Sequence, residues 1–196
     1  MRAAATIIAG AVAGVFSLAA TAQTTGSEVQ RDVNQQQRIE QGLKSGSLNT
    51  REASKLEAGE SRIDRMEANA EKDGKLSPAE KARIQRAQNQ ESREINKLEN
   101  NAARGNPNSA SSQRMQADVQ RNVNQERRIE QGVKSGQLTN REVGKLEAGQ
   151  ARVDRKEARA GSDGRVSANE QQRVQKAENK QSKRIYKEKH DKQTRH

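Results

Sequence analysis

The sequence has no cysteine and no tryptophan, and Phe16 and Tyr186 are its single phenylalanine and single tyrosine. Without cysteine there is no disulfide framework, no thiol nucleophile and no thiolate metal site. The two histidines, His190 and His196, lie in the C-terminal tail, and the sequence has no glycine-rich phosphate loop. No catalytic combination of residues can be assembled, so we expect a non-enzymatic protein. Aromatic side chains supply much of the buried area of ordinary cores, so stability must come from helix propensity, narrow apolar stripes, partners or ions.

What the chain does contain is charge and helix-forming residues. Of its 196 residues, 32% are charged and 30% are hydrophobic, and the abundance of Glu, Gln, Lys, Arg and Ala favours helix. We therefore predict an all-α fold. The net charge is +11, and it is uneven. Residues 23–106 hold 15 Lys and Arg against 14 Asp and Glu, whereas residues 107–196 hold 21 against 12. The basic character belongs to the second half.

The first 22 residues have the pattern of a secretory signal. Arg2 is followed by a mostly apolar run from Ala3 to Ala20, and Ala20-Thr21-Ala22 matches a small-residue cleavage site. An uncleaved membrane anchor is the alternative, but the run is barely long enough to span a bilayer. We expect cleavage before Gln23, no transmembrane segment afterwards, and a periplasmic or secreted bacterial protein.

The rest of the chain is one unit written twice with a period of 90 residues. Gly74 and Gly164 are 90 positions apart, as are Gly46 and Gly136, and more than half of the aligned positions are identical. The apolar residues recur at helical spacing, which predicts two tandem three-helix repeats. The expected boundaries are a first repeat at 28–100, a linker at 101–116, a second repeat at 118–187 and a basic tail at 188–196.

Each repeat has two corners of the form Gly-x-hydrophobic followed by a polar residue and a glutamate. The clearest corner runs from Asp73 to Glu80, and its twin runs from Asp163 to Glu170. Ser77 and Glu80 match a capping box with Pro78 at the first helical position, and Asn49 or Thr50 with Glu52 matches another. The corners therefore predict chain reversals between capped helices.

Numbered as a twelve-residue calcium loop, the same corner places Asp73 at position 5, Gly74 at position 6 and Glu80 at position 12. On these residues each repeat resembles a pair of EF-hand units, the first of each pair degenerate. The resemblance implies calcium, or a lanthanide, and pairing of the corners through Leu48–Leu76 and Leu138–Val166. It implies a site made by Asn69, Glu71, Asp73, Lys75 (through its carbonyl), Ser77 and Glu80, and a weaker twin at Asp163, Arg165, Ser167 and Glu170.

The corner departs from the EF-hand pattern in several ways. The twin has Arg159 at position 1 and Gly161 at position 3, and a cation at position 1 repels calcium. The segment between the two corners of a repeat also suits one continuous helix better than two. The alternative interpretation needs no ion, because Asp-Gly reverses the chain and the serine and glutamate cap the next helix.

A second acidic pattern lies on the helix before each Asp-Gly corner. Asp64 and Glu67, and 90 residues later Asp154 and Glu157, are one helical turn apart. They could add metal ligands, but arginines stand beside them, and such pairs usually form a solvated helix face. The solvated face is the interpretation we favour from sequence.

The basic second half suggests an alternative function, the binding of an anionic envelope polymer, a lipid surface or a protein partner by a non-catalytic helical protein. The candidate anion-binding residues are Lys180, Lys183, Arg184, Lys187 and Lys189. Nucleic-acid modules usually add stacking aromatics. The basic half of this sequence has a single aromatic residue, Tyr186, and this scarcity argues against a nucleic-acid partner. The thin apolar stripes also suit an oligomer.

Overall fold

A computed structural model describes residues 17–194, with side chains from Thr25 onward, and every regular element in that range is an α-helix. The predicted all-α fold is confirmed. The helices are α1 (Ser17–Ser45), α2 (Thr50–Ala70), α3 (Pro78–Glu99), α4 (Ala110–Lys134), α5 (Asn140–Ala160) and α6 (Ala168–Lys189). Of the expected leader, residues 1–16 lie outside the described range, and residues 17–22 belong to α1. Along the described helices, no stretch is long and apolar enough to cross a membrane.

The corners are built as the capping signals predict. Capping boxes join Asn49 to Glu52 and Ser77 to Glu80 in the first repeat. Equivalent boxes start α5 and α6 in the second repeat. Four glycines in the corners, Gly46, Gly74, Gly136 and Gly164, have φ between 74° and 91°, a backbone conformation that side chains disfavour. The turns are therefore fixed by local sequence.

Two helix starts differ from expectation. The helix expected from residue 28 begins before that residue, at Ser17. In the segment 101–116, expected to be a linker, α4 already begins at Ala110 because Ser109 caps it by accepting a hydrogen bond from the Ser112 N–H. Met115, on this early part of α4, is fully buried, so tertiary packing supports a helix that the polar composition concealed.

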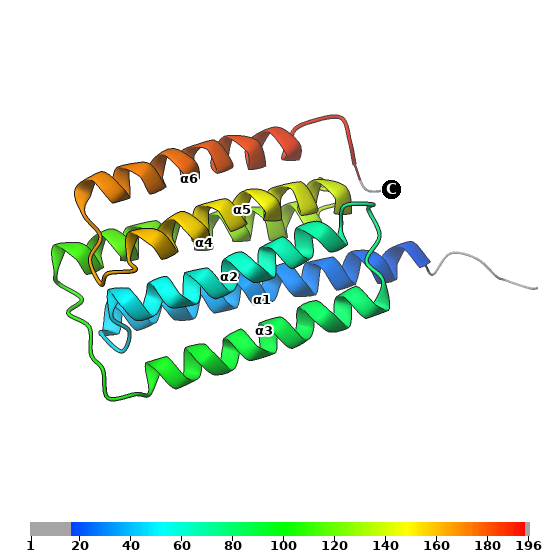
Figure 1. Ribbon diagram of the computed structural model, residues 1–196. Helices are drawn as coiled ribbons and strands as arrows, with labels where there is room; N and C mark the ends of the chain where they lie inside the picture. The colour runs from blue at the N-terminus through cyan, green and yellow to red at the C-terminus, as the bar shows by residue number, and fades with distance from the viewer. Residues whose placement is uncertain (1–16, 195–196) are drawn as a thin grey trace, which may run out of the picture.

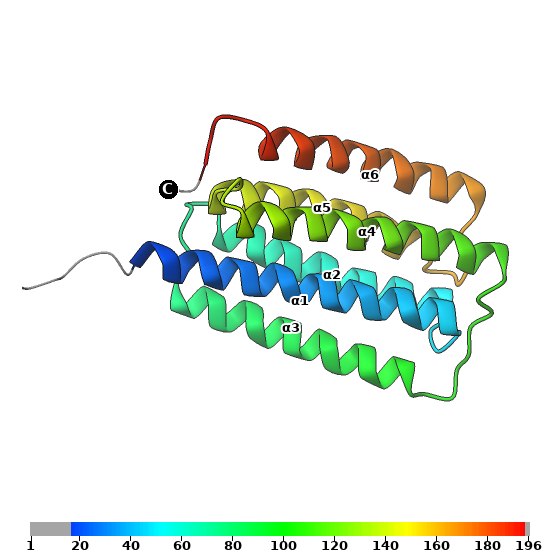
Figure 2. The ribbon, with the colours of Figure 1, turned by 180° about the vertical axis from the view of Figure 1, so that it is seen from behind.

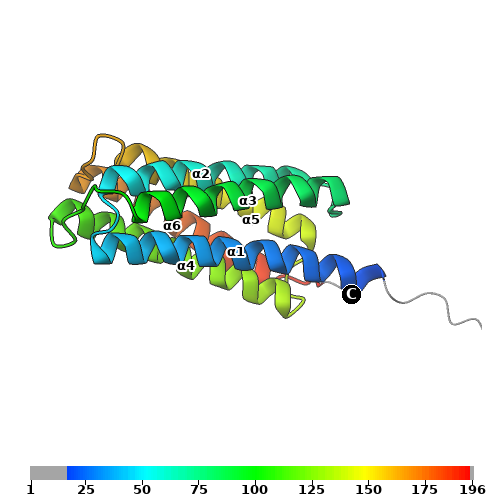
Figure 3. The same cartoon turned by 90° about the horizontal axis from the view of Figure 1, so that it is seen from below.

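The six helices form one elongated bundle. α1, α2, α4 and α5 occupy its middle, with α3 along one side and α6 along the other (Figure 1). Seen from behind, α1 and α4 lie in front of α2 and α5 (Figure 2), and the view from below separates the same two layers (Figure 3). α3 packs on α1 and α2, and α6 packs on α4 and α5.

The two repeats face each other across α2 and α5, which run antiparallel. The close approaches are symmetric: a Cβ on Gly144 would lie 3.0 Å from the Glu71 Cβ, and one on Gly161 would lie 2.9 Å from the Ser54 Cβ. Gly144 is the equivalent of Ser54 in the other repeat, and Gly161 is the equivalent of Glu71, since each pair is 90 positions apart. Near the middle, the Ser61 hydroxyl donates to the Ala151 carbonyl at 2.8 Å, again between equivalent positions. The repeats are thus related by an approximate twofold axis.

The pairing of corners implied by the EF-hand resemblance is wrong. Leu48 and Leu76 lie at opposite ends of α2, whose 21 residues span about 30 Å at 1.5 Å per residue. Leu48 instead shares a buried cluster with Val166 of the other repeat. The Arg51 side chain donates to the Asp163 carbonyl at 2.9 Å. Each corner meets a corner of the other repeat because α2 is continuous and its partner helix is antiparallel.

Candidate metal centre

The inner face of α2 carries acids where a core usually has apolar residues. The buried acids of α2 and its C-cap are Glu57, Glu60, Asp64, Glu67 and Glu71, at alternating spacings of three and four residues that place them on one face. α5 repeats the pattern with buried Glu147, Asp154 and Glu157. The two acidic faces oppose each other where the helices pack, so carboxyl groups line the centre of the bundle.

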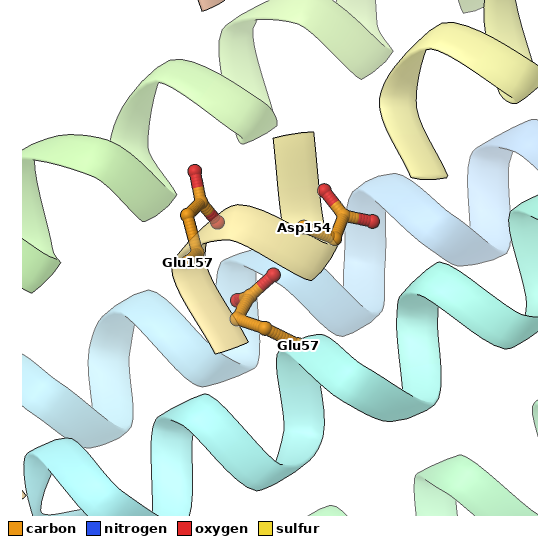
Figure 4. Close-up of side chains that lie close together, drawn as sticks. All are labelled: Glu57, Asp154 and Glu157. Carbon is orange, nitrogen blue, oxygen red and sulfur yellow. The ribbon is translucent and has the colours of Figure 1, made fainter. Parts of the chain in front are cut away.

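One cluster is formed by Glu57 from α2 with Asp154 and Glu157 from α5 (Figure 4). Each residue offers one carboxylate oxygen, and the three oxygens lie within 4.8 Å of one another. All three side chains are at most 1% exposed. Asp154 and Glu157 are three positions apart and therefore point from the same face of α5.

The second cluster is the twofold counterpart of the first. Asp64 and Glu67 come from α2 and Glu147 comes from α5. One carboxylate oxygen from each of the three residues lies within 4.8 Å of the other two. Adding 90 to Asp64 and Glu67 gives Asp154 and Glu157, and Glu57 corresponds to Glu147. Duplication of one acidic pattern has thus produced two equivalent clusters, each using both central helices.

Neighbouring acids of the two helices influence one another directly. Asp64 and its equivalent Asp154 each change the other's pKa, and Glu157 likewise affects the pKa of Glu57. Two neighbouring carboxyls can form a hydrogen bond only if one of them keeps a proton, because ionised carboxylates can only accept. The Asp64–Asp154 contact joins the two clusters into one row of six acids.

Buried amides hold the outer oxygens of this row. The Gln88 side chain donates to Glu67 Oε1 at 3.1 Å and to Asp32 Oδ1 at 2.8 Å. On the other side, Asn122 donates to Glu157 Oε2 at 2.6 Å and to Asp154 Oδ1 at 3.2 Å. Such contacts fix the orientation of the carboxylates and leave their remaining oxygens for another partner, as hydrogen bonds to metal ligands do at metal sites.

Other oxygens in the row lack any partner. Within the described range, neither carboxylate oxygen of Glu147 has a hydrogen-bond partner, although the residue is fully buried. Both oxygens of the adjacent buried acid Glu60 are in the same condition. No Lys or Arg is buried anywhere in that range. A buried carboxylate without a cation or donor is strongly unfavourable, so these groups must be protonated or must hold a cation.

Burial raises the pKa of every acid in the row. Loss of hydration is the largest cause for Glu147, and the neighbouring acid Glu126 raises its pKa further. The pKa of Glu57, Asp64, Glu67 and Glu157 is raised for the same reasons, burial first and neighbouring acids second. At the rim, burial raises the pKa of Glu28 and Asp118 to about 7 and that of Glu178 to about 8.

The donor set suits a hard cation. Each cluster supplies three carboxylates and no nitrogen or sulfur, which is the chemistry preferred by calcium, magnesium and manganese. Three carboxylates can offer up to six oxygens, within the range that calcium takes. Helical bundles commonly build metal sites from acids on facing helices.

In a third acidic group Glu142 is buried, whereas Glu188 and Asp191 are half-buried. Glu142 is engaged in the α5 cap, where it accepts from the Thr139 N–H at 2.8 Å. Glu188 faces Lys145 at 3.7 Å.

The six residues of the predicted loop site are not gathered around one point. Glu80 Oε2 accepts from the Ser77 N–H and hydroxyl at 3.0 and 2.6 Å, and these bonds lower the Glu80 pKa. Asp73 accepts from the Lys75 N–H at 2.9 Å, and Glu71 is buried against Gly144.

Asn69 and Glu80 do line one hollow of about 130 Å³, together with Arg83. The twin corner repeats the capping arrangement through Asp163 with Arg165 and Ser167 with Glu170. Calcium at these corners stays a prediction, and their hydrogen bonds are those of capped turns.

The favoured interpretation of Asp64, Glu67, Asp154 and Glu157 as a solvated face is wrong, since all four are at most 2% exposed. The neighbouring Arg62 and Arg152 are exposed, so each helix turns its arginines outward and its acids inward. The sequence did contain a signal: the acids of α2 recur at spacings of three and four over four turns, the spacing of a buried stripe. Because the residues of that stripe are charged, the pattern looked like a solvent-exposed helix face.

The predicted anion-binding residues fall into two groups. Lys180 and Arg184 line a groove between α5 and α6. Lys183 and Lys187 are exposed outside it, and Lys189 is half-buried near Gly132. Loss of hydration, with Arg128 as a smaller cause, lowers the Lys189 pKa.

Comparison of the chain with models of protein families, with curated proteins and with solved structures finds no match. Functional inference therefore rests on the residues and geometry described above.

Proposed function

We propose that the protein is a non-enzymatic cation-binding protein that holds hard divalent or trivalent cations between α2 and α5. Calcium is the first candidate ion and a lanthanide the second, because both prefer carboxylate oxygens. The observation that carries the proposal is the pair of twofold-related carboxylate clusters, buried without any Lys or Arg. A secretory leader would place this protein in the periplasm or outside the cell, as a buffer or sensor of the ion.

The unpartnered oxygens of Glu147 give the proposal support beyond the mere presence of acids. They are fully buried, and one of them lies within 4.8 Å of oxygens of Asp64 and Glu67. A cation at that point would replace the missing partner and offset two or three of the negative charges of the three carboxylates. An isolated structural acid would instead be expected to have a donor nearby.

Cation binding in this centre must displace protons. The carboxyls of the row have raised pKa values, and carboxylates bind metal only when deprotonated. We therefore expect proton release with each ion and an affinity that increases with pH. Calorimetry of calcium binding in buffers with different ionisation enthalpies would count the protons.

The direct test compares thermal melts of Gln23–His196 in chelator, in calcium and in a lanthanide, with metal content measured after dialysis. We expect stabilisation and retention of about two ions per chain, one per cluster. Luminescence lifetimes of bound europium in H2O and D2O would report whether the ion is shielded from water, as the buried centre requires and an exposed corner does not.

Three variants separate the core from the corners. Glu57→Gln and Glu147→Gln each remove one acid from one cluster, whereas Glu80→Gln removes the acid at position 12 of the predicted loop. Loss of ions in the first two variants and retention in the third would place the ions in the core. The reverse pattern would restore the EF-hand interpretation, and identical melts in all three solutions would reject cation binding.

A further inference from the structure

A basic groove of about 380 Å³ runs between α5 and α6. Six cationic side chains line it, and no carboxylate does: Arg152, Lys156, Arg173, Lys176, Lys180 and Arg184. Within the described range, none of the six forms an ion pair with an acid. Like charges this close to each other repel, so the groove is arranged for an anion that the chain itself does not supply.

The first repeat provides an internal comparison, because it has a groove of similar volume between α2 and α3 that carries a different charge. That groove has a volume of about 440 Å³ and contains Glu91 and Glu94 together with Lys55 and Arg62. Lys55 forms a salt bridge with Glu94 at 2.5 Å, so acids of the chain itself offset the positive charge of this groove. The fold therefore does not need six cations at this place.

Four differences between the repeats account for the change. Met66, Gln90, Glu91 and Glu94 of the first groove correspond to Lys156, Lys180, Gln181 and Arg184 of the second. Every one of these differences makes the second groove more positive. Helix solubility would be served equally by either set, whereas recognition of an anion would be served only by the second.

The lining indicates the kind of anion. Arg152, Arg173 and Arg184 present planar guanidinium groups, which bind phosphate oxygens in pairs, and the lysines add point charges. Between them the floor consists of Gly149, Val153 and Ala177, which leaves room for a compact group. The volume lies within the range of small-molecule sites, about 300–1,000 Å³.

We propose that the groove between α5 and α6 binds a phosphate-bearing ligand with several negative charges. The ligand could be a free phosphorylated anion or the phosphorylated headgroup of a lipid, and these share the chemistry that the groove recognises. The site is independent of the carboxylate centre, because its cations lie on the outward faces of α5 and α6 and the acids lie on the inward faces.

The test uses the full mature chain, freed of metal by chelation and dialysis, so that cation binding does not contribute. Calorimetry with inorganic tripolyphosphate and with orthophosphate measures the free-anion arm. Co-sedimentation with vesicles of phosphatidylcholine containing phosphatidylglycerol or a phosphoinositide measures the lipid arm. We expect saturable binding of one tripolyphosphate per chain that weakens as salt rises.

The decisive variant is the triple substitution K156M/K180Q/R184E, which installs three of the four differing residues of the first groove. It should weaken binding about 100-fold or more, since each lost charge-assisted contact corresponds to about tenfold. The matched control K72Q/R127E/R141Q removes the same net charge from exposed positions outside the groove, and we expect it to retain binding within about threefold. Circular dichroism melts check that both variants are folded.

The reciprocal variant M66K/Q90K/E94R gives the first groove three of the four differing residues of the second and should create a second binding site. Binding to phosphoinositide vesicles alone, lost in the first triple variant, would support the lipid form of the proposal. An equal loss of affinity in the triple variant and the matched control would show that binding depends only on the net charge of the protein, and it would overturn the proposal that the groove is the binding site. Absence of binding in both arms would also overturn it.

Discussion

The most informative single perturbation is Glu147→Gln, because it should have opposite effects with and without the cation. In the native chain this carboxyl is fully buried, has no hydrogen-bond partner among the described residues and is surrounded by other acids. Glutamine has nearly the same shape and carries no charge. Its amide can donate to Asp64 or Glu67, as Gln88 already does to Glu67.

Without cation at pH 7.5, we expect this substitution to stabilise the protein. Relief of one unsatisfied buried acid amounts to about 1–3 kcal/mol. A gain of about 2 kcal/mol raises the Tm of a chain of this size by roughly 4–8 °C. Because burial raises the Glu147 pKa, lowering the pH favours the protonated form of the wild-type carboxyl, so the difference between variant and wild type should shrink as pH falls.

With cation present, the same substitution should remove part of the stabilisation. One site at a ligand concentration 100 times its Kd contributes about 2.7 kcal/mol, so two sites contribute about 5.4 kcal/mol. The wild type should then gain roughly 11–22 °C in Tm and the variant about half of that. The assay is a circular dichroism melt at pH 7.5 in chelator and in calcium or a lanthanide.

The matched variant Glu57→Gln tests the equivalent position of the other cluster and should behave in the same way. The double variant should lose the whole cation response and be the most stable of the set in chelator. The reasoning is refuted if Glu147→Gln melts lower than wild type in chelator at pH 7.5, or if it keeps the full gain with cation. Either result would make Glu147 a structural acid.

Four further variants test the core and the corners. Glu178 has its pKa raised to about 8, mainly by burial. A raised pKa in the folded state favours stability below the unfolded pKa of about 4.5, and this stability is lost as pH rises through 8. Urea titrations of the metal-free protein should lose about 4 kcal/mol between pH 5 and 8 from this group, and Glu178→Gln should flatten the profile. Gly144→Ala would press a methyl group on Glu71, so it should cost about 1–3 kcal/mol and weaken cation binding. Gly74→Ala, with open space around it but φ of +83°, should cost about 1 kcal/mol and leave binding unchanged. Ser77→Ala removes a helix cap and should cost about 1 kcal/mol with the same cation response as wild type, whereas a lost response would place the ion at the corner.

The local structure of this protein was readable in its sequence. Capping boxes at Ser77–Glu80 and the glycines with positive φ depend on residues a few positions apart, and such interactions act wherever the helix finally packs. The period of 90 residues likewise predicted that the two halves would have the same helices. The scarcity of aromatic residues indicated that stability must come from sources other than large buried aromatic side chains.

The tertiary structure alone decided which face of α2 is buried. In sequence, Asp64 stands beside Arg62 and Arg65, and either the acids or the arginines could face the interior. Packing against the antiparallel α5 brings Asp64 onto its own equivalent Asp154, a contact between residues 90 positions apart. Such contacts arise from the twofold docking of the repeats, which local propensity does not encode.

The same docking of the two repeats explains why the candidate metal site lies in the centre of the bundle. The corners that resembled calcium loops are built as capped turns. A single repeat supplies only part of each cluster, Asp64 and Glu67 from one helix and Glu147 from the other. No spacing within one repeat reveals a site whose ligands are completed by its copy. The acids were visible in the sequence, and their convergence depends on two helices that meet only in the folded chain.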